Sequence, residues 1–350
     1  MNRSTWIAPV ALLFVALPAC TPVNDALPSR CEAIEIDAAR ELTVTDPAIV
    51  GSPRLGFARV MAAVLGDDPD LSARAWMDAW SAVPGEASLA DEVTQPWAAA
   101  SARGLDLSRA PFELVAVANR IDLSTLSTPT STRAGELRFV YGLVTASARR
   151  PLTVILELQL PASKSVAEWA SAWHALGSLD GDAYPQGLLA LVDAVLAEPL
   201  RGQVRTQDAR RQTPLLLEFD LGTGAPLAPS ALFNQPAGDV DPTALETFVT
   251  AEQQEVLAGT LVLPRSMLAA SVTTVRPPPL SGVPSNVADA FVDTTCSGCH
   301  TAEPTVDGTF HISPLRRGAD ALSPFLSNPS GPPDELSRRA EILRGLLCGS

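Results

Sequence analysis

The sequence contains little of the chemistry by which most enzymes can be recognised. It holds three histidines and has no Gly-x-Ser-x-Gly turn, phosphate-binding loop or dinucleotide-binding glycine pattern. The sequence therefore offers few residues from which a hydrolase triad could be built and no motif that would indicate a nucleotide site. One of the histidines, His174, lies in a predicted helix beside a tryptophan stripe. We interpret it as a hydrogen-bonded, partly buried residue and not as a catalytic base.

Positive charge is scarce as well. The 350 residues include 25 lysines and arginines, of which only Lys164 is a lysine, against 39 aspartates and glutamates. The formal net charge is therefore −14, and a surface of that sign repels phosphate backbones. We expect no nucleic-acid partner, whereas a redox partner with a basic surface would suit this charge.

Long apolar runs are also missing. The run from Ile7 to Leu17 has the length of a signal-peptide core and is too short to span a bilayer. It ends in Leu17-Pro18-Ala19-Cys20, which resembles the lipobox of bacterial lipoproteins. The resemblance implies that residues 1–19 are a signal peptide, that Cys20 is lipidated, and that the protein is anchored in the outer membrane, facing the periplasm or the cell surface. The alternative is ordinary cleavage that leaves Cys20 as a thiol.

The most informative stretch that is present is Cys296-Ser297-Gly298-Cys299-His300. It has the Cys-x-x-Cys-His form in which c-type haem is attached covalently. The thiols of Cys296 and Cys299 would add to the haem vinyl groups, and His300 would become an axial ligand of the iron. Residues 291–301 resemble the first haem-binding helix of c-type cytochromes, and this resemblance implies haem c as the cofactor.

The second axial ligand departs from that family. Class I cytochromes use a methionine that follows the motif, but here no methionine follows His300, and the last one is Met267. The remaining candidate is His311, and two histidine ligands would lower the reduction potential relative to histidine with methionine. An iron without a second protein ligand is the alternative.

Side chains that could surround a haem lie on both sides of the motif. The apolar ones are Phe291, Phe310, Ile312, Leu315, Leu322, Phe325 and Leu326. Arg316 and Arg317 could pair with the haem propionates through charge-assisted hydrogen bonds, or could simply be exposed.

Other roles for the cysteines stay open. Cys296 and Cys299 could form a disulfide in a non-redox module. They could also bind zinc with His311 and Cys348, although no clear fourth ligand follows at short spacing. Cys31 and Cys348 lie near the two ends of the mature chain, and domain termini are often close together in space. We therefore expect a Cys31–Cys348 disulfide in an exported protein.

The rest of the chain predicts an α+β fold. Alternating or continuous apolar residues at 112–121, 137–144, 152–160 and 215–221 predict an antiparallel sheet of about four strands packed with helices. Apolar residues at helical spacing predict helices near 57–65, 75–80, 166–176, 188–196 and 241–257.

These elements suggest an order of domains along the chain. We expect a tether at 20–40, an α+β domain of unknown role at 41–275, a Pro-rich linker at 276–285, and a small, mostly helical module with the Cys-x-x-Cys-His motif at 286–350.

Polar groups stand at the expected strand ends. They are Asn119 to Asp122, Glu136 with Arg138, and Arg205 to Asp208. We interpret them as ion pairs that brace the sheet, with ligand binding as the alternative.

The motifs together resemble a family. The lipobox, Asn119-Arg120-Ile121-Asp122, Gly135 to Phe139 and the C-terminal motif followed by Phe310-His311-Ile312 are similar to those of uncharacterised myxobacterial-type lipoproteins. The resemblance covers most of the mature chain and implies no known activity. Our leading hypothesis is a lipid-anchored cell-envelope protein with one c-type haem, which transfers electrons and does not turn over a substrate. The alternative is a non-redox envelope lipoprotein with a binding or structural role.

Overall fold

The computed structural model describes residues 31, 33–126, 134–146, 148–210, 213–221, 227–273, 280–302, 304–328, 330 and 334–349. The expected signal peptide, Cys20, much of the 20–40 tether and the first part of the 276–285 linker lie outside the described residues. Within the described ranges, none of the helices is long and apolar enough to cross a membrane.

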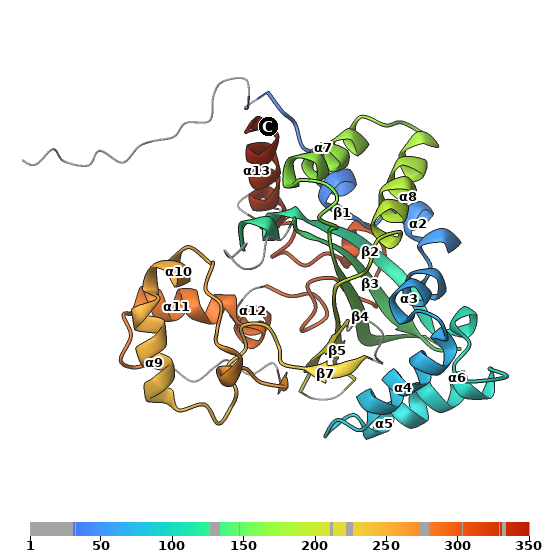
Figure 1. Ribbon diagram of the computed structural model, residues 1–350, viewed down its shortest axis with the longest axis horizontal. Helices are drawn as coiled ribbons and strands as arrows, with labels where there is room; N and C mark the ends of the chain where they lie inside the picture. The colour runs from blue at the N-terminus through green and yellow to red at the C-terminus, as the bar shows by residue number, and fades with distance from the viewer. Residues whose placement is uncertain are drawn as a thin grey trace, which may run out of the picture.

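The fold is α+β, with one antiparallel sheet whose strands follow chain order (Figure 1). The strands are β1 (Thr43–Val44), β2 (Phe112–Arg120), β3 (Glu136–Val144), β4 (Arg149–Gln159), β5 (Gly202–Asp208), β6 (Leu215–Asp220) and β7 (Ala228–Ser230). A further short strand, β8 (Ser271–Thr273), pairs with the first half of β6, whose second half pairs with β7.

The sheet is therefore larger than the four strands expected. The four predicted strands correspond to β2, β3, β4 and β6. The others were missed because β1, β7 and β8 are only two or three residues long and β5 is mostly polar. Periodicity cannot be read from so few residues, and a polar strand resembles a loop.

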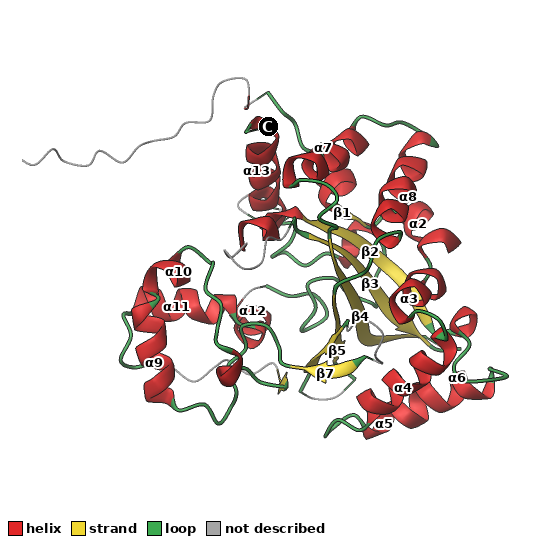
Figure 2. Cartoon of the chain, in the orientation of Figure 1, coloured by secondary structure: helices red, strands yellow, loops and turns green. Residues whose placement is uncertain are grey.

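Helices from the first part of the chain cover one face of the sheet (Figure 2). The larger ones there are α3 (Phe57–Leu65), α4 (Pro69–Ser81), α7 (Val166–Gly177) and α8 (Ala183–Leu196), accompanied by α2 (Pro47–Val50), α5 (Ala87–Leu89) and α6 (Gln95–Ala99). Their apolar stripes pack with the inward residues of the strands in the main core, where Trp76, Trp80, Trp169 and Trp173 are fully buried. Burial of these side chains is the main driving force for this layer.

Local sequence signals fix several helix ends. Ser165 and Glu168 form a reciprocal capping box at the start of α7. Asp241 caps α9 (Pro242–Ala251), and Pro242 occupies its first turn. The single helix expected over 241–257 is broken at Glu252, and α10 (Gln253–Leu257) follows as a separate short helix.

A second apolar cluster lies apart from the main core. It joins Leu245 and Val249 of α9 to Val283, before α11 (Ser285–Thr294), and to Phe291 within α11. This cluster takes residues from both sides of the expected linker at 276–285. The last helix, α13 (Glu335–Cys348), contributes Leu336 and Leu343 to the main core.

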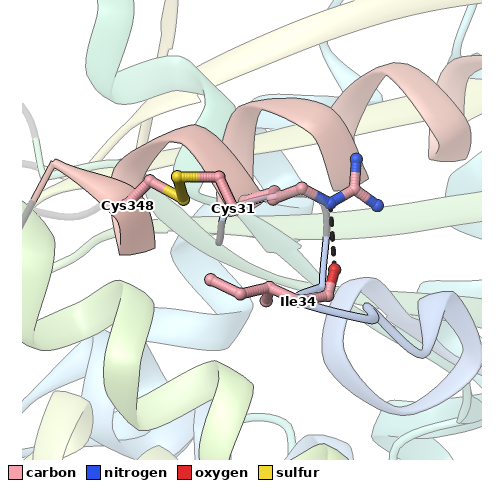
Figure 3. Close-up of a disulfide and its surroundings, with 4 residues drawn as sticks. Cys31, Ile34 and Cys348 are labelled. Carbon is pink, nitrogen blue, oxygen red and sulfur yellow. Dashed lines mark hydrogen bonds between the residues drawn. A yellow bond between two sulfur atoms is a disulfide. The ribbon is translucent and has the colours of Figure 1, made fainter. Parts of the chain in front are cut away.

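The two ends of the described chain are joined. Cys31 and Cys348 form a disulfide, the pairing expected from the cysteine positions, and Arg344 of α13 donates a hydrogen bond of 2.9 Å to the carbonyl of Ile34 (Figure 3). Tyr184 donates to the carbonyl of Arg40 at 2.9 Å. The second half of the expected tether is thus packed against the domain.

Candidate functional site

The Cys-x-x-Cys-His motif opens α12 (Cys296–Ala302), which follows α11 after a sharp change of direction. Thr295 is extended between the two helices, with φ −88° and ψ 150°. Its hydroxyl donates to the carbonyl of Val292 at 2.7 Å and accepts from the amide of Gly298 at 2.9 Å. Gly298 is required because a Cβ there would lie 1.9 Å from the Val292 carbonyl oxygen.

The two motif cysteines are thiols and not a disulfide in this structure. The sulfur of Cys296 lies 3.7 Å from the carbonyl oxygen of Phe233, and the sulfur of Cys299 lies 3.3 Å from Nε2 of His311. Burial raises the pKa of the Cys296 thiol. Cys296 is therefore not an activated thiolate nucleophile, which needs a lowered cysteine pKa.

His300 is oriented by the backbone. Its Nδ1 lies 2.8 Å from the carbonyl oxygen of Thr309, and because a carbonyl only accepts, Nδ1 carries the proton. Burial lowers the pKa of His300 to about 4, so the ring is neutral at ordinary pH. A neutral imidazole whose Nδ1 is bound to a carbonyl leaves Nε2 available as a metal ligand.

His311 lies beside His300 and not across from it. The two ring centroids are 4.7 Å apart with 33° between the ring planes, and Phe325 covers His311 with centroids also 4.7 Å apart. An iron held between two imidazole nitrogens at about 2 Å each would put the ring centres about 6 Å apart. The pair in this arrangement therefore does not fit as opposite axial ligands of one iron.

Two adjoining cavities flank His300, between the motif and the sheet. One has a volume of about 230 Å³ and reaches His311, Phe325 and α13. The other, of about 210 Å³, is lined by Cys296 and Cys299. Neither reaches the roughly 300–1,000 Å³ of a typical ligand pocket. They share the lining residues Arg120, Arg138, Arg205, Leu216 and His300, so the two cavities adjoin at these side chains.

The sheet face below these cavities carries a ladder of buried ion pairs. Glu157 of β4 lies between Arg138 of β3, at 2.8 Å, and Arg205 of β5, at 3.3 Å. Arg138 also pairs with Glu136 at 2.7 Å, and Arg205 with Glu218 at 2.9 Å. Alternation along the strands places these charges on the face opposite the apolar core.

The electrostatics of the ladder keep its central acid ionised. Burial alone would raise the pKa of Glu157, but Arg138, Arg205 and a hydrogen bond from Gln203 outweigh it, so this pKa is lowered. Burial raises the pKa of Glu218 at the end of the ladder, although Arg205 opposes the change. The polar groups predicted at strand ends thus brace the sheet and also line the cavities.

A second charged group connects the sheet to α13. Asp122, directly after β2, accepts from Arg120 at 2.9 and 3.0 Å and from Arg338 at 3.2 Å. Glu335 accepts from Arg338 and, at 2.9 Å, from Nε of Arg339. Arg339 and Glu335 line the larger cavity, and neither was singled out from the sequence. A paired Arg-Arg on a helix is typical of an exposed surface, so no sequence signal identified them.

Of the side chains expected around a haem, Ile312, Phe325 and Leu326 line the larger cavity. Several other expected contributors lie elsewhere. Phe291 belongs to the second apolar cluster, where Met267 also packs. Arg316 pairs with Asp307 and Arg317 with Glu113, and neither arginine lines the two cavities beside the motif.

His174 is remote from this site. Its Nδ1 lies 2.9 Å from the buried carboxylate of Glu41, on the helix-covered side of the sheet. The interaction agrees with a structural histidine.

Zinc binding by the motif does not fit the structure. Cys348, one of the ligands considered, is in the disulfide with Cys31. In the described ranges, no three histidine, cysteine, aspartate or glutamate side chains are grouped so as to hold a metal ion.

Comparison of the chain with protein-family models, with curated proteins and with solved structures found no match. The function is therefore argued from the site itself.

Proposed function

We propose that this protein is a lipid-anchored cell-envelope protein that carries one covalently attached c-type haem and transfers electrons. The observation that carries the proposal is the position of His300 in a Cys-x-x-Cys-His turn. Its Nδ1 is bound to the Thr309 carbonyl, its ring is neutral, and it stands where the two cavities meet. A proximal ligand needs this tautomer and this access.

The cysteines of the motif would make the covalent attachment. Each thiol adds across a vinyl double bond, the sulfur to one carbon and the hydrogen to the other, so no oxidant and no leaving group are needed. Cys296 and Cys299 line the cavity beside His300, as such attachment requires. When bound, the group supplies one-electron exchange between ferric and ferrous iron.

The compartment agrees with this chemistry. The Cys31–Cys348 disulfide belongs in an oxidising environment, and the first residues of the chain read as a lipoprotein signal. The net charge of −14 favours a redox partner with a basic surface.

Electron transfer is favoured over turnover of a substrate. The acids that line the cavities at Glu136, Glu157 and Glu335 are held in ion pairs with arginines. A general acid or base must be able to exchange its proton near neutral pH, and the lowered pKa values of Glu157 and Glu335 keep them ionised.

Export of the full chain in a host with haem-attachment machinery tests the proposal. We expect a haem stain on denaturing gels and a Soret band, both lost in Cys296→Ala and kept in the neighbouring control Ser297→Ala. Because His311 is not opposite His300, His311→Ala should leave the spin state unchanged. A folded, disulfide-bonded but colourless wild-type protein would reject the haem and favour the non-redox lipoprotein.

A further inference from the structure

The corner of the larger cavity at Arg339 has an excess of positive charge. In the part of the chain that the structure describes, the guanidinium groups of Arg120, Arg338 and Arg339 take their acid partners from two carboxylates, those of Asp122 and Glu335. The larger cavity itself is lined by four guanidinium groups, those of Arg120, Arg138, Arg205 and Arg339, and by two carboxylates, those of Glu157 and Glu335. Buried charges are normally compensated, so this imbalance calls for a further anion.

Arg339 has hydrogen-bonding capacity to spare on the side of the cavity. Its side chain is only 8% exposed, and among the described residues its one hydrogen bond runs from Nε to Glu335. The two terminal nitrogens, which carry four N–H donors, belong to a side chain that lines the cavity. These donors are therefore available to a ligand in the cavity.

The protonation of Arg339 reflects the same imbalance. Burial, with the repulsion of Arg120 added to it, lowers the pKa of Arg339 to about 10, although Asp122 and Glu335 oppose the change. The neighbouring Arg338 is 52% exposed, and its pKa is raised, first by its hydrogen bond to Glu335. Two adjacent arginines on one helix thus have opposite environments.

We propose that Arg339, together with Arg120, binds a carboxylate in the cavity between the sheet and α13. A guanidinium fork binds a carboxylate through two parallel hydrogen bonds. The cavity of about 230 Å³ admits a small carboxylate, and the apolar Ile312, Phe325 and Leu326 in its wall suit a short hydrocarbon chain.

This carboxylate has two possible sources. One is a free small monocarboxylate. The other is a propionate of the haem of the proposed function, because the larger cavity continues beyond His300 on the side away from the cysteines. The chemistry that Arg339 recognises is the same in both cases, and the site does not depend on haem being present.

The test uses the full mature chain in the Cys296→Ala/Cys299→Ala form, which cannot hold a haem covalently. Acetate and propanoate are titrated at constant ionic strength against chloride while thermal unfolding is followed. We expect a saturable rise in Tm, as for any ligand that binds only the folded state. Arg339→Gln should weaken the apparent affinity roughly tenfold to hundredfold, the worth of charged hydrogen bonds. The control Arg103→Gln, at a side chain that is 71% exposed and outside the cavity lining, should leave the affinity within about twofold.

The outcomes separate this proposal from the haem proposal. If the haem-loaded wild type no longer responds to added carboxylate while the cysteine variant does, the propionate is the occupant. If both respond, the ligand is a free carboxylate. If haem never attaches but the titration saturates, only the haem proposal fails. No saturable response in the cysteine variant, or an equal response in Arg339→Gln, overturns the carboxylate site. Arg339→Lys, which keeps the charge and loses the fork, provides a second variant if Arg339→Gln does not fold.

Discussion

Gly298 should be the position in the motif that least tolerates a side chain. The first perturbation is Gly298→Ala, which adds one methyl group within 1.9 Å of the Val292 carbonyl oxygen and 2.6 Å of the Thr295 hydroxyl. An ordinary carbon–oxygen contact is about 3.3–3.6 Å. The methyl group can therefore be accommodated only if α12 moves away from α11 by more than about 1 Å.

The size of the effect follows from what α11 holds in place. Phe291 and Val292 are buried, and Phe291 belongs to the second apolar cluster. Overpacking of a close contact typically costs about 1–3 kcal/mol and occasionally more. We expect Gly298→Ala to lower the free energy of unfolding by about 3 kcal/mol, since a rigid backbone carbonyl cannot rotate away.

Gly345 provides the matched control, because it lies within α13 and an added Cβ there meets nothing within 4 Å. Replacement of glycine by alanine inside a helix stabilises it by about 0.5–1 kcal/mol. Urea unfolding of the disulfide-bonded protein should therefore shift the midpoints of Gly298→Ala and Gly345→Ala in opposite directions. Equal midpoints for the two variants would refute the close approach of α12 to α11.

Two further predictions concern the ion-pair ladder. Glu157→Gln removes the central acid between Arg138 and Arg205. It should lower the free energy of unfolding by about 3 kcal/mol, the lower end for breaking a buried pair, because each arginine keeps one other acid. The control Glu113→Gln, at a side chain that is 53% exposed, should cost less than about 1 kcal/mol, and similar urea midpoints for both variants would contradict the burial of the ladder. The pKa values of Asp122, Glu157 and Glu335 are lowered in the folded protein, so their stabilisation is complete above their ordinary pKa of about 4 and is lost as pH falls below it. Urea midpoints measured from pH 6 to pH 3 should therefore fall below about pH 4.5, less steeply in Glu157→Gln, and a flat profile would contradict the assignment.

The main layer of the fold could be predicted from sequence because its elements each have one apolar face. β4 shows this in the alternation of Leu152, Val154, Leu156 and Leu158, all fully buried. β5 could not be recognised, because most of its residues are polar and Val204 is its single buried aliphatic residue. A strand whose second face meets a charged cavity has neither an apolar run nor a clear alternation.

Only part of the candidate site could be predicted from the sequence. The motif and its histidine are local, and their spacing alone indicates the chemistry. Arg339 and Glu335 lie some forty residues after the motif, and their role depends on how α13 docks against the sheet. The docking buries Arg339 and leaves Arg338 half exposed, a distinction that helical spacing alone does not make. Likewise, His311 is close to the motif in sequence, but the loop returns it beside His300 and not opposite it.

The position of α13 explains how a poorly compensated arginine stays buried. The same helix buries Leu336 and Leu343 in the main core and ends in Cys348, which is bonded to Cys31. Burial of two leucines contributes about 3–6 kcal/mol, and closure of a loop of 317 residues contributes roughly 6 kcal/mol on the chain-entropy view. These terms can offset the few kcal/mol that burial of a charged guanidinium costs. Packing and the disulfide therefore keep Arg339 buried despite its unfavourable electrostatics. An anion that pairs with Arg339 would relieve this cost, and the relief would add to the free energy of binding.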